Sequence, residues 1–253
     1  MLALAACGMG TAGHNGRHMW QGQRVSVVFP AYNEQDGIAA AVADFSSIDA
    51  VDEVLVVNNN SRDDTAARAD AAGARVVDEP RQGYGYALRR GLAEAQGEYV
   101  VLAEPDGTFM GKDVLKLLTY ADDFDLVLGT RTTRELIWRG ANMGWQLRWG
   151  NWIVAKFLQV LFGGPSLSDC GCTLRLIRRD AAQQMLNRFT VGGSHFLPEM
   201  VCLALLDRTR LIEVPVNYRH RVGESKITGS FNTALRVGAR MLGLIVRYRL
   251  LGR

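Results

Sequence analysis

Short runs of Val, Leu and Ile alternate along the first half of the chain with longer stretches that mix polar and apolar residues. The runs at residues 25–29, 53–57, 74–77, 98–103 and 125–128 predict buried strands. Helices are expected at residues 36–46, 83–96 and 112–121, and another is expected to start at Ser61, where Asp64 completes a capping box. This order predicts an α/β fold, a mostly parallel sheet with helices on both faces.

Polar residues stand just past the ends of these strands. They are Asn33, Asn58, Asn59, Glu104, Asp106 and Arg131. Ligands of such sheets bind at the carboxyl ends of the strands, so we expect these residues to share one site.

The apolar run that ends at Ala103 passes directly into Glu104-Pro105-Asp106. In an extended segment, residues two apart point to the same side, so the two carboxylates can converge. Hard oxygen ligands at an open position suit Mg²⁺ or Mn²⁺ carrying a nucleotide diphosphate. The alternative is an acidic turn with no ligand.

Composition narrows the class of protein. The chain has 253 residues, of which 48% are hydrophobic and 22% charged, and its net charge of +3 is too small to indicate nucleic-acid binding. Basic residues dominate from Arg131 onward, which suits phosphates or an anionic membrane surface. The four Cys include no second ligand pair for a zinc site, and we expect reduced thiols in a cytosolic compartment.

Two further sequence patterns do not indicate a function. Gly83-x-Gly85 lacks the third glycine of a dinucleotide site, where Leu88 stands instead. No apolar run is long enough to span a membrane. Residues 1–22 are interpreted as a disordered leader, with lipidation at Cys7 as a weaker alternative.

Seven motifs, in order, resemble the family 2 glycosyltransferases of the GT-A fold, and most of all the dolichol-phosphate mannose synthase-like enzymes that act on polyprenyl phosphates. They are PAYNE at 30–34, NNNSRDDT at 58–65, GYGYA at 83–87, EPD at 104–106, GTR at 129–131, DCGCTLRL at 169–176 and RVGESK at 221–226. The resemblance covers residues 28–226 and implies a glycosyltransferase domain over residues 23–230.

The resemblance implies a role for each matching residue. Asp106, Asp169 and Arg131 are expected to take part in catalysis. Glu104 and Asp106 are expected to bind the metal, Mg²⁺ or Mn²⁺. The nucleotide sugar is expected against Pro30, Tyr32, Asn33, Glu34, Asn58, Asn59, Gly85, Glu104 and Pro105. The acceptor phosphate is expected against Arg148, Arg221, Ser225 and Lys226.

Two departures from the family pattern leave questions open. Asn58-Asn59 replaces a pair of Asp near the base, so the donor is expected to be either a GDP- or a UDP-hexose. Glu104 replaces an Asp and is one methylene longer. Asp169 is interpreted either as orienting the acceptor or sugar, or as capping the next segment.

Two segments suit a membrane surface. Trp138, Trp145, Trp149 and Trp152 are spaced by seven, four and three residues, which forms one stripe on a helix. Residues 231–253 are mostly apolar, with Arg236, Arg240 and Arg247 on one face, as in amphipathic helices at the bilayer interface. The alternative for both segments is a helix that covers the catalytic domain.

The expected function is metal-dependent, inverting transfer of a hexose from a nucleotide diphosphate sugar to a polyprenyl phosphate such as dolichyl or undecaprenyl phosphate. The expected location is the cytoplasmic face of the membrane, as a peripheral protein without a transmembrane helix. Two alternatives stay open. One is a family member with a saccharide or small natural product as acceptor, and the other is a non-catalytic protein that binds nucleotide sugars.

Overall fold

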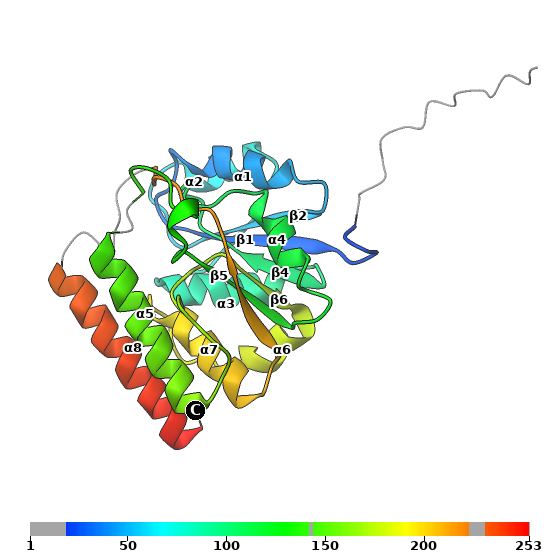
Figure 1. Cartoon of the computed structure of the whole chain (residues 1–253). Helices are drawn as coiled ribbons and strands as arrows, with labels where there is room; N and C mark the ends of the chain where they lie inside the picture. The colour runs from blue at the N-terminus through cyan, green and yellow to red at the C-terminus, as the bar shows by residue number, and fades with distance from the viewer. Residues whose placement is uncertain (1–18, 142–143, 223–230, 253) are drawn as a thin grey trace, which may run out of the picture.

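The computed structural model describes residues 19–141, 144–222 and 231–252. A mixed sheet forms its centre (Figure 1). The strands are β1 (Val25–Ala31), β2 (Glu53–Asn58), β3 (Arg75–Asp78), β4 (Tyr99–Leu102), β5 (Leu126–Thr130), β6 (Arg175–Arg178) and β7 (Leu211–Pro215), in the order β3-β2-β1-β4-β6-β5-β7. The predicted α/β class is confirmed.

All neighbouring strands pair in parallel except at β6, which runs antiparallel to both β4 and β5. The five predicted strands are present with small shifts at their ends, and β6 and β7 are additional. Since β4 and β5 both oppose β6, they point the same way as β1 and β2. The carboxyl ends of these four strands therefore lie at one edge.

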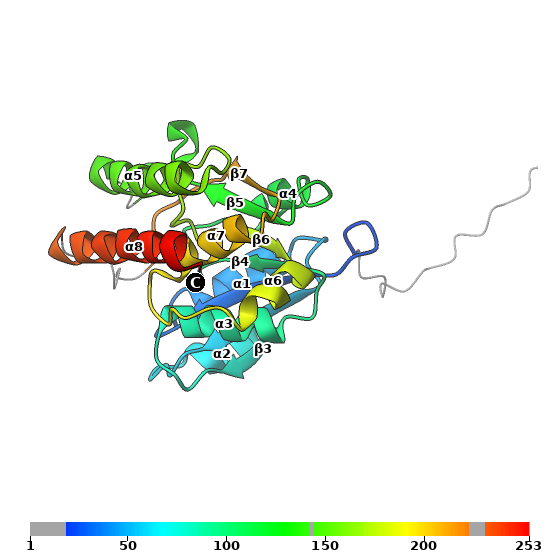
Figure 2. The same cartoon turned by 90° about the horizontal axis from the view of Figure 1, so that it is seen from below.

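Helices cover both faces of the sheet (Figures 1 and 2). They are α1 (Ile38–Ser46), α2 (Thr65–Ala71), α3 (Tyr84–Glu94), α4 (Asp113–Leu118), α5 (Trp145–Phe162), α6 (Arg179–Leu186), α7 (Phe196–Leu206) and α8 (Phe231–Leu251). Strand alternation divides the core: Val27 and Val101 join the cluster of α1 and α4, while Val28 and Leu102 join that of α3 and α5 to α8.

The start of α2 differs from the prediction. The helix begins at Thr65 instead of Ser61 because the intervening side chains serve other backbone groups. The Ser61 hydroxyl accepts a hydrogen bond from the Asn33 amide at 3.1 Å, and Asp63 accepts one from the Thr65 amide at 3.1 Å. The predicted capping box is absent, since Asp64 makes no side-chain cap.

Helices α5 and α8 lie side by side along one side of the molecule (Figures 1 and 2). Trp138 does not belong to α5, which begins at Trp145, so the predicted stripe of four Trp is wrong at this residue. The Trp138 indole instead donates to Asn217 at 3.3 Å. No helix in the described ranges has the length and apolar character needed to cross a bilayer.

Candidate active site

The carboxyl edge of the sheet collects the polar residues that the sequence predicts there. β1 ends two residues before Asn33, β2 ends at Asn58, β4 ends two residues before Glu104, and β5 ends directly before Arg131. β6 enters from the same edge and brings the preceding segment, with Asp169 and Thr173, into the site. The site is thus formed by five strands.

Glu104 and Asp106 lie at the centre of this edge. Glu104 accepts hydrogen bonds from the hydroxyls of Thr173 at 2.7 Å and Tyr84 at 3.3 Å. Burial and then the nearby charge of Asp106 raise the pKa of Glu104 to about 7. A cation beside these two carboxylates would favour the ionised form of Glu104.

Asp106 is the better metal ligand of the two. Its side chain is 1% exposed, and one oxygen, Oδ1, accepts from the Thr108 amide at 3.0 Å and from its hydroxyl at 2.5 Å. The other oxygen, Oδ2, is buried and has no hydrogen-bond partner among the described residues. A buried, orphaned carboxylate oxygen beside a second acid fits a hard divalent cation.

The rest of the coordination shell must come from other molecules or other parts of the chain. The described ranges contain no group of three His, Cys, Asp or Glu side chains placed to hold a metal. Diphosphate oxygens and water are ligands that Mg²⁺ accepts readily beside one or two carboxylates.

Arg131 and Asp169 form a bidentate ion pair at the same edge of the sheet. Arg131 Nε lies 2.8 Å from Asp169 Oδ2, and Nη2 lies 3.0 Å from Oδ1. Burial is the largest single influence and lowers the pKa of Arg131, but the charge and hydrogen bonds of Asp169, together with smaller contributions from other neighbours, raise the pKa well above its ordinary value. Asp169 is therefore committed to holding Arg131, whose guanidinium also lies over the Tyr218 ring at 5.2 Å.

Glu213 on β7 supports this pair and was not predicted from sequence. Its carboxylate accepts the backbone amides of Ser168 and Asp169, each at 2.8 Å, and so fixes the segment that carries Asp169. Glu213 lies outside all seven motifs, and no spacing pointed to it.

The asparagines on the proposed nucleotide side have different environments. Asn59 is 3% exposed and uses both ends of its amide on the 79–83 segment, with donors to Glu79 and Arg81 carbonyls and an acceptor for the Gly83 amide. Asn58 contacts Asp78 at 2.8 Å and accepts from the Ser61 amide. Asn59 thus shapes the loop, and Asn58 is the more accessible of the pair.

Asn33 and Glu34 lie at the start of the segment after β1. Asn33 has a φ of +53° and accepts the Arg62 amide at 2.8 Å, while the Glu34 amide donates to Thr65 Oγ1 at 2.8 Å. These contacts join the β1 and β2 ends into one wall. Pro30 is buried within β1, and Tyr32 is half-buried beyond it.

Gly85 acts through close packing. A Cβ at Gly85 would lie 2.6 Å from the Val191 carbonyl oxygen, and its amide donates to the Gly192 carbonyl at 2.9 Å. This contact fixes the first turn of α3, from which the buried Tyr84 reaches Glu104 and Thr173. Tyr84, like Thr173, lies inside a predicted motif, but nothing in the sequence indicated its role.

The predicted acceptor-side residues are only partly brought together. Arg221 lies between Asp106 and Glu34, at 3.0 Å from each. Arg148, near the start of α5, is directed to the Thr132 carbonyl at 3.5 Å. Pro105 is buried between the two acids. Ser225 and Lys226 lie outside the described residues.

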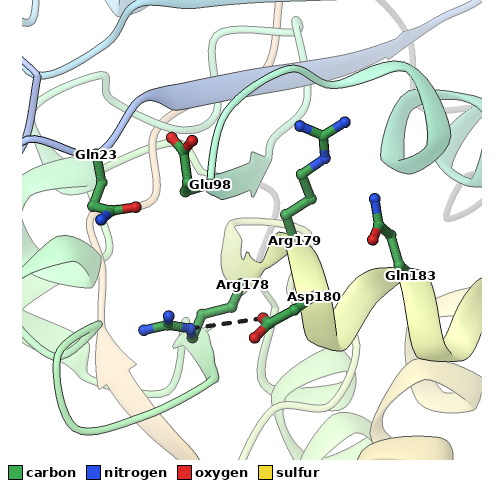
Figure 3. Close-up of a pocket in the computed structure, with 6 residues that line it drawn as sticks. All are labelled: Gln23, Glu98, Arg178, Arg179, Asp180 and Gln183. Atoms are coloured by element: carbon green, nitrogen blue, oxygen red, sulfur yellow. Dashed lines mark ion pairs between the residues drawn. The ribbon is translucent and has the colours of Figure 1, made fainter.

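A second hollow lies at the opposite edge of the sheet, where β1 and β4 begin (Figure 3). Its volume is about 380 Å³, and it is lined by Gln23, Glu98, Arg178, Arg179, Asp180 and Gln183. Arg178 and Asp180 pair across it at 3.7 Å. None of the predicted site residues lines it, so it is separate from the catalytic edge.

Comparison with known proteins identifies the class. The family model described as Glycosyl transferase family 2 matches residues 26–186. An uncharacterised glycosyltransferase of Mycobacterium tuberculosis is 34% identical over 217 residues, which is 85% of this chain and 94% of that protein. A dolichyl-phosphate hexose transferase of Haloferax volcanii is 31% identical over 206 residues, 80% of this chain and 86% of that protein.

A solved structure shows the same fold. Glucosyl-3-phosphoglycerate synthase of Mycobacterium tuberculosis, in complex with Mn²⁺, UDP and its product glucosyl-3-phosphoglycerate, superposes with a TM-score of 0.67 at 22% identity. The match covers 90% of this chain and 80% of that one. The chain belongs to glycosyl transferase family 2, and it is a glycosyltransferase with the GT-A fold. Family membership therefore shows that the non-catalytic alternative is wrong.

Proposed function

We propose that the enzyme transfers a hexose from a nucleotide diphosphate sugar to a polyprenyl phosphate, with Mg²⁺ or Mn²⁺ as the metal. The observation that carries the donor half is the buried Oδ2 of Asp106, which has an ion-pair partner in Arg221 but no hydrogen-bond partner among the described residues, beside Glu104 at the carboxyl edge. The similarity to a dolichyl-phosphate hexose transferase supports the acceptor. The Mn²⁺ and UDP bound by the structural neighbour support the metal and the diphosphate.

Asp106 would hold the metal, with Glu104 assisting. A bound divalent ion there neutralises the charge that develops on the leaving diphosphate. The protein's own residues align the reactants: Arg131, fixed by Asp169, presents a buried cation at the strand end, and Arg148 and Arg221 add positive charge toward a phosphate.

The acceptor phosphate needs little help to react. Its oxygen is already anionic, so direct attack on the anomeric carbon would invert the configuration without a strong base. Both oxygens of Asp169 are engaged by Arg131, which favours orientation of the site over proton abstraction as its role. Asp169 Oδ1 also accepts the Gly171 amide at 3.2 Å, so the contacts of Asp169 are compatible with both interpretations, orientation of the site and capping of the next segment.

An exposed apolar face supports contact with a membrane surface. On α5, the side chains of Trp149, Trp152, Ile153 and Val160 are 57%, 41%, 52% and 79% exposed. On the adjacent α8, Arg236, Arg240 and Arg247 are exposed. Apolar residues flanked by cations suit an anionic lipid surface, so we place the enzyme peripherally, with this face on the bilayer.

Helix α8 also belongs to the fold. Leu244, Ile245 and Tyr248 are buried, and the Tyr248 hydroxyl donates to the buried Glu199 at 2.6 Å. Glu199, in the first turn of α7, thus anchors α8. We propose residues 23–230 as the transferase domain and residues 231–253 as the membrane-surface helix, packed on that domain.

A second acceptor class deserves a direct test, because the structural neighbour bears a name with a small phosphorylated product. Radiolabelled nucleotide sugar is incubated with Mn²⁺ and either polyprenyl phosphate or 3-phosphoglycerate. Label in the organic phase supports the lipid acceptor. Label recovered on 3-phosphoglycerate alone, after chromatographic separation from the unreacted nucleotide sugar, would replace it with the second class.

Asp106→Asn provides the matching test of the site. The substitution keeps the volume and removes the charge that holds the metal, so transfer should fall by at least about a hundredfold. Asp123→Asn, an exposed carboxylate away from the carboxyl edge, is the control and should keep full activity. Normal transfer by Asp106→Asn would disprove the metal site.

A further inference from the structure

Arg221 lies between the carboxylates of Asp106 and Glu34. Its Nη1 is 3.0 Å from Asp106 Oδ2, and its Nη2 is 3.0 Å from Glu34 Oε1. The three side chains are 23%, 1% and 14% exposed, so the pairs are shielded from bulk water. In this state the cation beside Asp106 is a guanidinium group.

The backbone keeps Arg221 in this place. The Val222 amide donates to the Asp106 carbonyl, and the Arg219 amide donates to the Thr108 carbonyl, both at 2.8 Å. The Arg219 side chain also donates to the Gly107 and Phe109 carbonyls at 3.2 and 2.8 Å. Residues 219–222 therefore run along the acid-bearing loop and hold the guanidinium against it.

The contact with Asp106 is close but incomplete. Within the described ranges, Asp106 Oδ2 and Arg221 Nε both lack a hydrogen-bond partner although they are buried. The charge pair is thus made without the directed hydrogen bond that stabilises a buried ion pair. This oxygen can therefore exchange the guanidinium group for a cation that it binds more strongly.

A divalent ion and Arg221 compete for the same oxygen. Two positive groups within about 3 Å of one carboxylate oxygen would repel each other strongly in a site of low dielectric. Glu34 gives the guanidinium a second partner, so it can leave Asp106 without losing every contact.

We infer that Arg221 is a built-in competitor of the divalent metal: it neutralises Asp106 before the metal arrives, and metal binding displaces it toward Glu34 and the incoming phosphates. The inference rests on the proposed metal site. Its consequence is that the free enzyme binds metal weakly, and that metal and diphosphate bind together, because the displaced cation gains a phosphate partner.

Manganese binding to the full chain tests this without any catalytic assay. The free Mn²⁺ signal in electron paramagnetic resonance is titrated with wild type, Arg221→Ala and Arg221→Gln, in the absence of nucleotide. Removing the competing charge should tighten Mn²⁺ binding by about tenfold, a size typical of coupled binding events. Arg221→Gln keeps a long polar side chain and guards against misfolding of the Ala variant, and thermal melting checks both.

Two controls separate the possible failures. Arg62→Ala removes one exposed positive charge near the same edge and should leave Mn²⁺ affinity within about twofold. If Asp106→Asn binds Mn²⁺ as wild type does, the proposed metal site is wrong. If Asp106→Asn loses binding but neither folded Arg221 variant binds more tightly than wild type, only the competitor role is wrong.

Discussion

At the scale of single residues, the site contains charged side chains that burial destabilises and that neighbouring opposite charges stabilise. Asp169 compensates Arg131, and Arg221 compensates Asp106. Glu104 differs, because its hydrogen bonds come from the neutral hydroxyls of Thr173 and Tyr84. It is the acid for which ionisation in the folded protein is costly without a metal.

This cost predicts a pH-dependent stability. The pKa of Glu104 rises from the ordinary 4.5 to about 7 on folding, so its contribution to the free energy of unfolding falls as pH rises through this window. Without divalent metal, Glu104→Gln should be more stable than wild type at pH 8 by on the order of 2 kcal/mol.

Urea unfolding of both proteins at pH 8 and pH 5 provides the measurement. Near pH 5 Glu104 is largely protonated in the folded protein, so the gain should shrink to a small fraction. A gain of equal size at both pH values would show that hydrogen bonding or packing, and not the buried charge, sets the effect.

The sequence could predict Glu104 and Asp106 because two acids at a strand end form a local pattern. It could not reveal the neighbours that set their chemistry. Tyr84 and Glu213 reach the site from α3 and β7, and their contacts depend on tertiary packing that no spacing encodes. The tie between Arg221 and Asp106 likewise joins residues more than a hundred positions apart.

At the scale of elements, α3 is held unusually close to the sheet. A Cβ at Gly91 would lie 2.2 Å from Val28 Cγ1 on β1. Local patterns predicted both elements, with the ends of α3 shifted by one or two residues, but not this approach. The start of α2 was misplaced for a related reason, since Ser61 and Asp63 serve neighbouring backbone groups instead of a cap.

The close approach predicts a compensating pair of substitutions. Gly91→Ala should lower the free energy of unfolding by about 1–3 kcal/mol, because the new methyl group has no room against Val28. Val28→Ala in the same chain makes space and should recover part of that loss beyond the sum of the single effects, measured as a double-mutant cycle by urea unfolding. Strict additivity would contradict the packing explanation.

At the scale of the whole molecule, α5 and α8, which both carry exposed side chains, lie next to each other on one side (Figure 1). The sequence predicted both amphipathic segments, but it included Trp138 in the first because residue spacing alone does not show that the helix begins at Trp145. It could not show that α5 and α8 lie side by side, which is what turns two stripes into one face.

Vesicle binding tests that face. Trp149→Ala combined with Trp152→Ala should weaken binding to anionic vesicles by roughly tenfold or more, since each indole buries apolar area in the interface. Tyr120→Ala, an exposed aromatic just after α4, is the matched control. Flotation at low and high salt measures both, and binding should fall with salt because the Arg charges are screened. Unchanged binding by the double variant would remove α5 from the membrane contact.

The antiparallel strand β6 has a consequence for the connectivity of the chain. In a wholly parallel sheet, each strand contributes to the active edge only the loop that follows it. β6 contributes the loop that precedes it, so the chain passes from the end of α5 at Phe162 to Asp169 within seven residues. The helix proposed to contact the bilayer and the acid that holds Arg131 are thus joined by a short segment, so a displacement of α5 at a lipid surface would be transmitted directly to the candidate active site.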